Sequence, residues 1–175
     1  ARNTETGIEV RVHPMLIPLD HPLAGVNDAF NAVFVHGDAV DDAMFYGRGA
    51  GEMPTASAVM GDIIDVARNI QFHCCGRIHC TCYKNLPIKK ITEIESKYFM
   101  RMLVEDKPGV LAKIADTLGR NNVSIAQVVQ KNKINDLAEL VVITDSVLEQ
   151  NFADALTSIK GMDITKEIST VIRVY

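Results

Sequence analysis

The sequence predicts an α+β protein in two parts, a partial β-sheet with one helix followed by a complete βαββαβ module. Two observations predict it. Short segments in which apolar and polar residues alternate are typical of half-buried strands, and the segments between them repeat apolar residues at helical spacing. In the second part, the order of these elements gives one small sheet with two helices on one face. The expected boundaries are 1–72 for the first part, 73–95 for a connector and 96–175 for the module.

The first part contains strands and a helix, but too few of them for a core. Residues 8–12 alternate apolar and polar side chains, and residues 31–36 and 42–46 are expected to form two strands on either side of a turn. Pro54 is expected to start a helix with one apolar stripe. Because so few elements bury little apolar surface, we expect this part to be the end of a larger domain that starts before Ala1.

The module opens with a strand and a capped helix. Residues 98–104 are rich in large apolar and aromatic side chains, as in a buried strand. Asp106 is a suitable N-cap and Pro108 suits the first helical turn. Apolar residues at helical spacing then extend to Leu118, and Gly119, followed by two asparagines, can end the helix.

The rest of the module repeats this pattern. Ser146 and Glu149 form an S-x-x-E capping box ahead of a second amphipathic helix, which Gly161 closes. A polar turn is expected at residues 131–136. The remaining strands are expected at residues 123–129, 138–144 and 164–174.

The composition excludes several classes of protein. Of the 175 residues, 47% are apolar and 23% are charged, which is typical of a globular chain and not of a disordered one. The formal net charge is −4 and no basic face stands out, so nucleic acid is not an expected partner. No apolar run approaches the ~20 residues that cross a bilayer, and no signal peptide is recognisable. We therefore expect no membrane partner.

The cysteines form one cluster, which also contains histidines: His73, Cys74, Cys75, His79, Cys80 and Cys82. A secreted disulfide framework would distribute its cysteines along the chain, so we expect a reducing, cytoplasmic compartment. His73, Cys75, Cys80 and Cys82 could supply the four ligands of a zinc site. Adjacent cysteines do not easily face one metal, however, and C-x-C is shorter than the usual ligand spacing. An adventitious disulfide and inert thiols in a flexible loop are the alternatives, and the prediction is no metal.

A glycine-rich segment, Gly47-x-Gly49-x-Gly51, leads from a predicted strand directly into a predicted helix. Glycine lets the backbone approach a ligand closely, and a helix N-terminus presents N–H groups and a positive dipole. This combination suits a phosphate or the edge of a cofactor. The spacing is not G-x-G-x-x-G and no βαβ unit follows. A tight strand-to-helix turn that simply needs glycine is therefore the alternative.

Residues 44–59, MFYGRGAGEMPTASAV, with Gly61-Asp62 after them, closely resemble the C-terminal signature of homoserine dehydrogenase. Residues 8–14 and 20–35 resemble the segments that precede this signature in the family, so the similarity covers about residues 5–70. The resemblance implies an α/β parent enzyme in which a Rossmann domain and the catalytic lysine precede Ala1. No catalytic residue is therefore expected in this chain, and the chain alone is predicted to be inactive.

The same resemblance implies the reaction and the cofactor. Homoserine dehydrogenases interconvert homoserine and aspartate semialdehyde with NAD(P). The glycine loop would fold against the nucleotide domain, which would place Gly49, Gly51 and Glu52 beside the nicotinamide cofactor. We expect NAD(P) to act in the parent enzyme and not to bind tightly to this chain alone.

The second part resembles an ACT domain, a small ligand-binding module, whose usual opening is matched by residues 106–111, DKPGVL. The resemblance implies a homo-oligomer, at least a dimer, that binds an amino acid between copies. The effector would contact Asp106, Gly109, Val110 and Leu111 of one copy and Asn122, Ser124 and Ile125 of another. In a threonine-pathway enzyme the natural effector would be threonine, acting by feedback.

Two alternatives stay open from the sequence. The ACT-like module could serve only to assemble subunits. The whole chain could also be a stand-alone amino-acid-binding or assembly module without catalysis.

Overall fold

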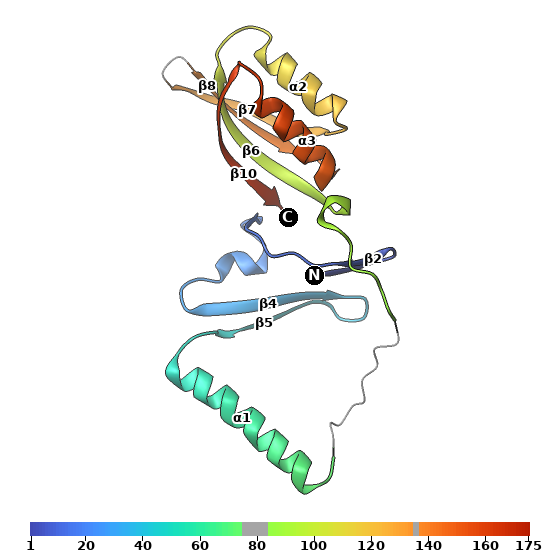
Figure 1. Ribbon diagram of the computed structural model, residues 1–175. Coiled ribbons are helices and arrows are strands. Elements are labelled where there is room, and N and C mark those ends of the chain that lie inside the picture. The colour runs from blue at the N-terminus through green and yellow to red at the C-terminus, as the bar shows by residue number, and fades with distance from the viewer. Residues whose placement is uncertain (75–83, 135–136) are drawn as a thin grey trace. The chain divides into compact units, whose positions relative to one another are not determined.

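The computed structural model describes residues 1–74, 84–134 and 137–175, and its chain divides into two compact units. The first, here called the sheet unit, consists of residues 1–16 and 86–175. The second, here called the hairpin–helix unit, lies within residues 17–85. Figure 1 shows both along the chain, and each is described by itself.

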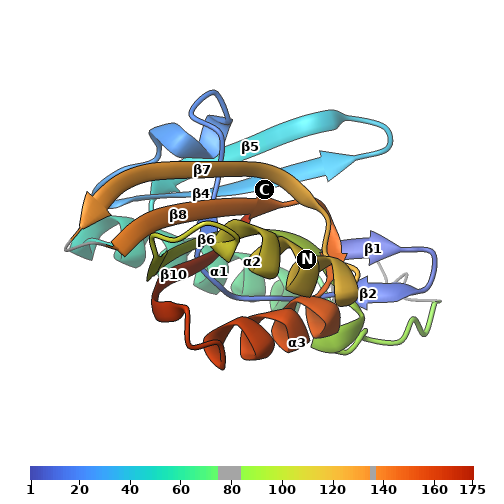
Figure 2. The same cartoon turned by 90° about the horizontal axis from the view of Figure 1, so that it is seen from above.

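The sheet unit confirms the predicted α+β class and its βαββαβ order. The four main strands pair with one another in antiparallel fashion, in the order β10-β6-β8-β7, and the short strand β9 also pairs with β6. Figures 1 and 2 show both helices on the same face of this sheet. The elements are β6 (Glu95–Glu105), α2 (Val110–Arg120), β7 (Ile125–Ile134), β8 (Leu137–Thr144), β9 (Val147–Leu148), α3 (Glu149–Lys160) and β10 (Thr165–Val174).

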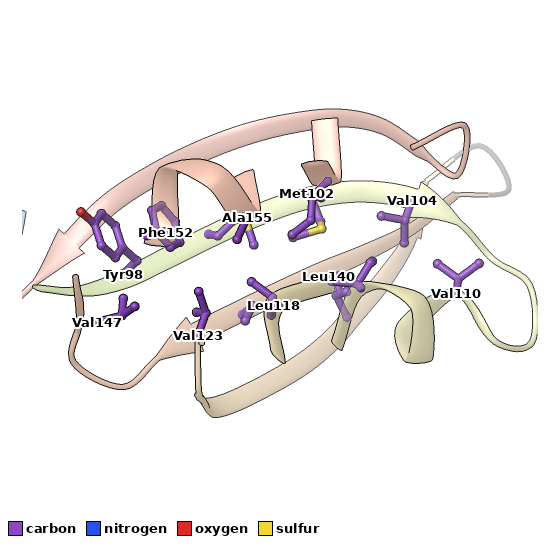
Figure 3. Close-up of a cluster of buried hydrophobic side chains, with 14 of the residues drawn as sticks. Tyr98, Met102, Val104, Val110, Leu118, Val123, Leu140, Val147, Phe152 and Ala155 are labelled. Atoms are coloured by element: carbon purple, nitrogen blue, oxygen red, sulfur yellow. The ribbon is translucent and has the colours of Figure 1, made fainter. Parts of the chain in front are cut away.

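The core lies between this sheet and its two helices (Figure 3). Alternate residues of β6 point into it, because successive side chains of a strand face opposite sides of the sheet. Tyr98 and Phe152 of α3 stack with ring centroids 3.6 Å apart. The helices contribute residues at helical spacing, including Ile114 and Leu118 of α2 and Ile159 of α3, all with no exposed surface.

The sheet unit also contains the first sixteen residues of the chain. β1 (Arg2–Thr4) and β2 (Gly7–Glu9) form an antiparallel hairpin (Figure 2), and β3 (Met15–Leu16) pairs in parallel with β10. The strand predicted at residues 8–12 is therefore shorter than expected. Beside the hairpin, the backbone N–H of Ile8 donates to the Pro87 carbonyl and the N–H of Lys89 donates to the Ile8 carbonyl, at 2.9 and 3.0 Å.

The hairpin–helix unit has little core of its own. It comprises η1 (Pro22–Gly25), the antiparallel pair β4 (Phe30–Gly37) and β5 (Asp41–Arg48), and α1 (Glu52–Gln71). The two strands lie where the sequence predicts them. None of the residues of α1, all of which the structure describes, is buried, and Phe45 and Ile70 are 68% and 70% exposed. This agrees with the expectation that the first part cannot bury its apolar surface alone.

The helix caps differ from those that the sequence predicts. α2 begins after Gly109, which has a left-handed φ of 88°, and not after Asp106. α3 begins after Leu148, and no side chain caps it. The hydroxyl of Ser146 instead donates to Glu95 at 3.2 Å, so the capping box does not form. β9 occupies the residues that the box would need, because they pair with β6.

Two further boundaries also differ. α1 begins at Glu52, two residues before Pro54. The polar turn predicted at residues 131–136 is largely strand, because β7 continues to Ile134 and pairs there with Leu137 of β8. Among the described helices, none combines the length and apolarity needed to cross a bilayer.

Candidate functional site

The loop between β6 and α2 gathers the first group of predicted effector residues. Asp106, Gly109, Val110 and Leu111 line one cavity of about 80 Å³. Gly109 allows the sharp turn into α2, because its φ of 88° is one that side-chain-bearing residues rarely adopt. The loop residue Lys107 also lines the cavity, and the other lining residues come from the sheet beside the loop: Val104, Glu105, Gln130, Ala138 and Leu140.

Lysine side chains form ion pairs with Glu105, at the end of β6, and with Asp106, in the loop. Lys166 and Lys107 lie 2.9 Å from the two oxygens of Glu105, and hydrogen bonds from them lower the pKa of Glu105 to about 2. Lys133 of β7 pairs with Asp106 and lowers its pKa. Both carboxylates are therefore charged at neutral pH, and each is paired with lysine.

Sequence reasoning missed the residues that the sheet brings to this site, among them Gln130 and Lys133 of β7. Gln130 lines it from β7, and its side-chain amide lies 3.4 Å from Oδ1 of Asp106. Lys133, further along the same strand, pairs with the other oxygen of Asp106. Nothing in the local sequence marks them, because the pairing of β7 with β8 brings them toward the loop.

The second group of predicted effector residues lies past the other end of α2. Asn122 has a left-handed φ of 57°, and its backbone N–H donates to Gly119 at 3.0 Å, which ends the helix. Asn122 and Ser124 are exposed and Ile125 is half-buried. α2 has 11 residues, so its two ends are about 16 Å apart. Within one chain, these residues do not meet the cavity.

The glycine loop of the hairpin–helix unit leads from β5 into α1. A Cβ at Gly49 would lie 1.6 Å from the side-chain nitrogen of Asn31. Gly51 is the N-cap of α1 with φ 137° and ψ 148°, which is a conformation for glycine. Glu52 is exposed in the first turn of α1. Gly49 and Gly51 therefore each have a local structural reason to be glycine.

The Cys/His cluster lies mostly outside the described residues. His73 has φ 52° just after α1, and Cys74 follows it. The structure does not describe Cys75, His79, Cys80 and Cys82, on which the zinc alternative depends. Elsewhere in the described ranges, no group of three or more His, Cys, Asp or Glu side chains is placed to hold a metal ion.

Comparisons with known proteins match both parts. The family model for homoserine dehydrogenase matches residues 1–64, and the model for the ACT domain matches residues 98–162. Homoserine dehydrogenases of Corynebacterium glutamicum and Neisseria gonorrhoeae are 41% and 40% identical over 97% and 98% of this chain. The chain spans 38% and 41% of the length of these two relatives.

A solved structure is similar over nearly the whole chain. The crystal structure of a homoserine dehydrogenase from Thiobacillus denitrificans matches 99% of this chain with a TM-score of 0.87 and 35% identity, and the match covers 40% of that protein. The homoserine dehydrogenase of S. aureus at pH 6.0 matches 93% of the chain with a TM-score of 0.54 and 28% identity.

The match to the ACT domain covers both helices and most strands of the antiparallel sheet, and the glycine loop that opens a long helix lies within the match to homoserine dehydrogenase. Over nearly its whole length, the chain corresponds to the C-terminal region of homoserine dehydrogenases, with an ACT domain.

Proposed function

We propose that this chain serves as the C-terminal part of an enzyme that interconverts homoserine and aspartate semialdehyde with NAD(P). The observation that carries the proposal is the similarity to homoserine dehydrogenases, which extends through both parts and the connector at 41% identity over 97% of the chain. The chain would contribute one wall of the cofactor site and an amino-acid-binding regulatory domain. The hydride-transfer chemistry belongs to the nicotinamide group.

The N-terminus of α1 suits one edge of such a cofactor. Gly49 and Gly51 let the backbone approach closely, and the first turn of α1 presents N–H groups and a positive dipole. The exposed carboxylate of Glu52 would favour the oxidised nicotinamide ring, because that ring carries a positive charge and the reduced ring does not.

A chimaera tests this part of the proposal. We would replace the matched region of the Corynebacterium glutamicum enzyme with this chain and expect homoserine oxidation, whereas the 175-residue chain alone should show none. Glu52→Gln should raise the KM for the oxidised cofactor about fivefold, as expected for loss of one nearby charge, and should change the KM for the reduced cofactor less. Gly47→Ala is the control, because a Cβ there has open space. Equal effects of Glu52→Gln on both cofactor forms would contradict the proposed position of the carboxylate.

The second part of the proposal is that the cavity beside α2 binds an amino-acid effector, and that this effector is threonine. The N-terminus of α2 would receive the carboxylate of the ligand. Gln130 offers an amide to a side-chain hydroxyl from the opposite wall of the cavity. Asp106, which is charged at neutral pH, would attract the ammonium group.

Calorimetric titrations with threonine and with valine test whether Gln130 binds the side-chain hydroxyl of the ligand. The two amino acids have the same shape, but valine lacks the hydroxyl group. If Gln130 binds the hydroxyl, threonine should bind about 10- to 100-fold more tightly, because a lost hydrogen bond costs about 1–3 kcal/mol. Gln130→Leu should remove this preference. If threonine produces no heat, the assignment of threonine as effector fails.

Dimerisation is the third part of the proposal. Asn122, Ser124 and Ile125 lie at the far end of α2 from the cavity, so only a second copy could bring them to the ligand. Threonine should therefore shift the chain toward the dimer in light scattering. Asn122→Gly, which suits the left-handed backbone of Asn122, should weaken threonine binding without changing the folded structure. A monomeric chain that binds threonine with full affinity would contradict a shared site.

A further inference from the structure

The segment 7–16 matches the homoserine dehydrogenase model in sequence, but it belongs to the same compact unit as the ACT domain, and its last two residues join the sheet of that domain. β3 forms the edge of that sheet, with Met15 opposite Arg173 and Leu16 opposite Val174 of β10. The backbone N–H of Tyr175 then donates to the Leu16 carbonyl at 2.9 Å. We call residues 7–16 the strap.

Buried polar contacts attach the strap at two further points. Arg11 donates from its guanidinium to the hydroxyl of Ser96, which is 7% exposed at the start of β6. The Lys89 ammonium lies 3.0 Å from a carboxylate oxygen of Glu9, which is also 7% exposed. Charged groups buried in this way bind strongly to their partners, because separation would leave one charge without water or a counter-ion.

Two neighbouring strands join the strap to the effector cavity. β6 and β10 are paired from Lys97 and Val174 at the strap to Val104 and Thr165 beside the cavity. At the cavity end, the N–H of Glu105 donates to Ile164 at 2.9 Å. A strand of this length spans about 30 Å. The pairing shifts register twice near the cavity, between Thr165 and Glu167 and between Ile168 and Thr170, and is regular from Thr170 to the strap.

We propose that the strap unfolds and shifts with the ACT sheet as one cooperative unit, and so carries changes at the effector cavity to the dehydrogenase segment that begins at Ile17. The structural part of this inference stands on the contacts above. Its regulatory part rests on the proposed function, namely that an amino acid binds beside α2. Residues 1–16, which include the strap, would then unfold and move together with the ACT domain.

Hydrogen exchange on the full chain tests cooperativity without any ligand. Ile114→Val truncates a fully buried residue of α2, far along the sequence from the strap. Such a change typically speeds globally limited exchange about 2- to 10-fold. We expect the same factor at the N–H groups of Ile8, Lys89 and Tyr175 as at core amides of β6. Leu118→Ala is a second, larger truncation, and Arg120→Ala, at an exposed position, is the control.

The amides of β4 and β5 serve as an internal reference, because they belong to the other compact unit and should not respond. If the strap amides exchange at an unchanged rate in Ile114→Val and Leu118→Ala while those of β6 accelerate, the strap opens independently and the proposal is overturned.

A threonine titration tests the regulatory part. At a concentration of 100 Kd, binding should slow globally limited exchange about 100-fold, both in β6 and at Ile8 and Tyr175. Protection of β6 without protection of the strap would overturn the coupling. No protection anywhere would instead reject threonine as the effector, and the Ile114→Val result would still decide whether the strap belongs to the sheet.

Discussion

The ion pair between Glu9 and Lys89 shows how a single contact can fix a long-range arrangement. Both side chains are largely buried, with 9% and 19% of their surfaces exposed. Loss of either partner of a buried pair is unfavourable, since the remaining group would be a buried charge without a counter-ion. The ion pair therefore joins the N-terminal hairpin to the strand-like segment before β6 without needing a large apolar contact.

Removal of the lysine should destabilise the sheet unit. Lys89→Met keeps the length of the side chain but leaves the carboxylate of Glu9 buried and unpaired, which should lower the free energy of unfolding by about 3 kcal/mol. Lys160→Met, at the exposed last residue of α3, should lower it by less than about 1 kcal/mol. Urea denaturation followed by circular dichroism measures both. Similar effects of the two variants would mean that Glu9 reaches solvent.

The Glu105 carboxylate predicts a pH dependence with a definite sign. Its pKa falls from an ordinary value of 4.5 to about 2, because Lys166 and Lys107 stabilise the charged form. A lowered pKa in the folded state means that the contribution to stability is complete above about pH 4.5 and is lost as the pH falls toward 2. Glu105→Gln should therefore reduce the loss of stability between these pH values, measured by urea denaturation at pH 6, 4 and 3. An unchanged pH profile would contradict this interpretation.

At the scale of elements, the start of α1 depends on backbone conformation more than on a cap. Gly51 occupies φ 137° and ψ 148°, and its Cβ, if present, would lie 3.2 Å from Pro54. The sequence also indicates that this glycine loop lies beside the cofactor. Because a substitution of Gly51 would change the folding of α1 as well as any contact with the cofactor, Glu52 is the better position at which to test cofactor binding.

Gly51→Ala should destabilise the start of α1 by about 1–3 kcal/mol, because this backbone region is accessible almost only to glycine. Gly47→Ala should have a smaller effect, since a Cβ at that position meets no atom within 4 Å. The helical signal in circular dichroism during thermal unfolding measures the difference. Equal melting of the two variants would show that α1 adapts its first turn.

Order and type of the elements in the ACT domain could be predicted because apolar spacing determines which face is buried. Residues 98–104, for example, lie inside β6 and alternate between core and surface. The helix caps could not be predicted, because Asp106 pairs with Lys133 of β7 and Ser146 donates to Glu95 instead of capping a helix.

In the candidate site, the residues of the β6–α2 loop were recognisable from its sequence. Gln130 was not, since it reaches the cavity only through the pairing of β7 with β8.

At the scale of the whole molecule, the compact units differ from the division that the sequence suggests. The connector was expected to extend to residue 95, but Ile94 is 1% exposed and its carbonyl accepts the N–H of Glu149 at 2.9 Å. This residue packs at the beginning of α3 and belongs to the folded sheet unit. The regulatory domain therefore needs residues on the N-terminal side of β6.

Ile94→Ala in the full chain should lower the stability of the sheet unit by about 2–5 kcal/mol, as for other truncations of buried aliphatic residues. Ile91→Ala, at a residue that is 49% exposed, is the matched control and should cost much less. Chemical denaturation measures both. A fragment of residues 86–175 should accordingly be more stable than one of residues 96–175, and the reverse order would exclude a structural role for Ile94.

The pairing of β3 with β10 has a consequence for how the protein is made. These strands lie near opposite ends of the sequence, and β10 follows every other strand in it. On the ribosome, β3 is synthesised before β10, and at about 5–20 residues per second it remains without its partner strand until residues 165–174 have emerged. Contacts between such distant residues also form slowly, because a long loop must close first. During that interval the apolar residues of the early segments are accessible to chaperones, and the final step of folding is the closure of the sheet by its last strand.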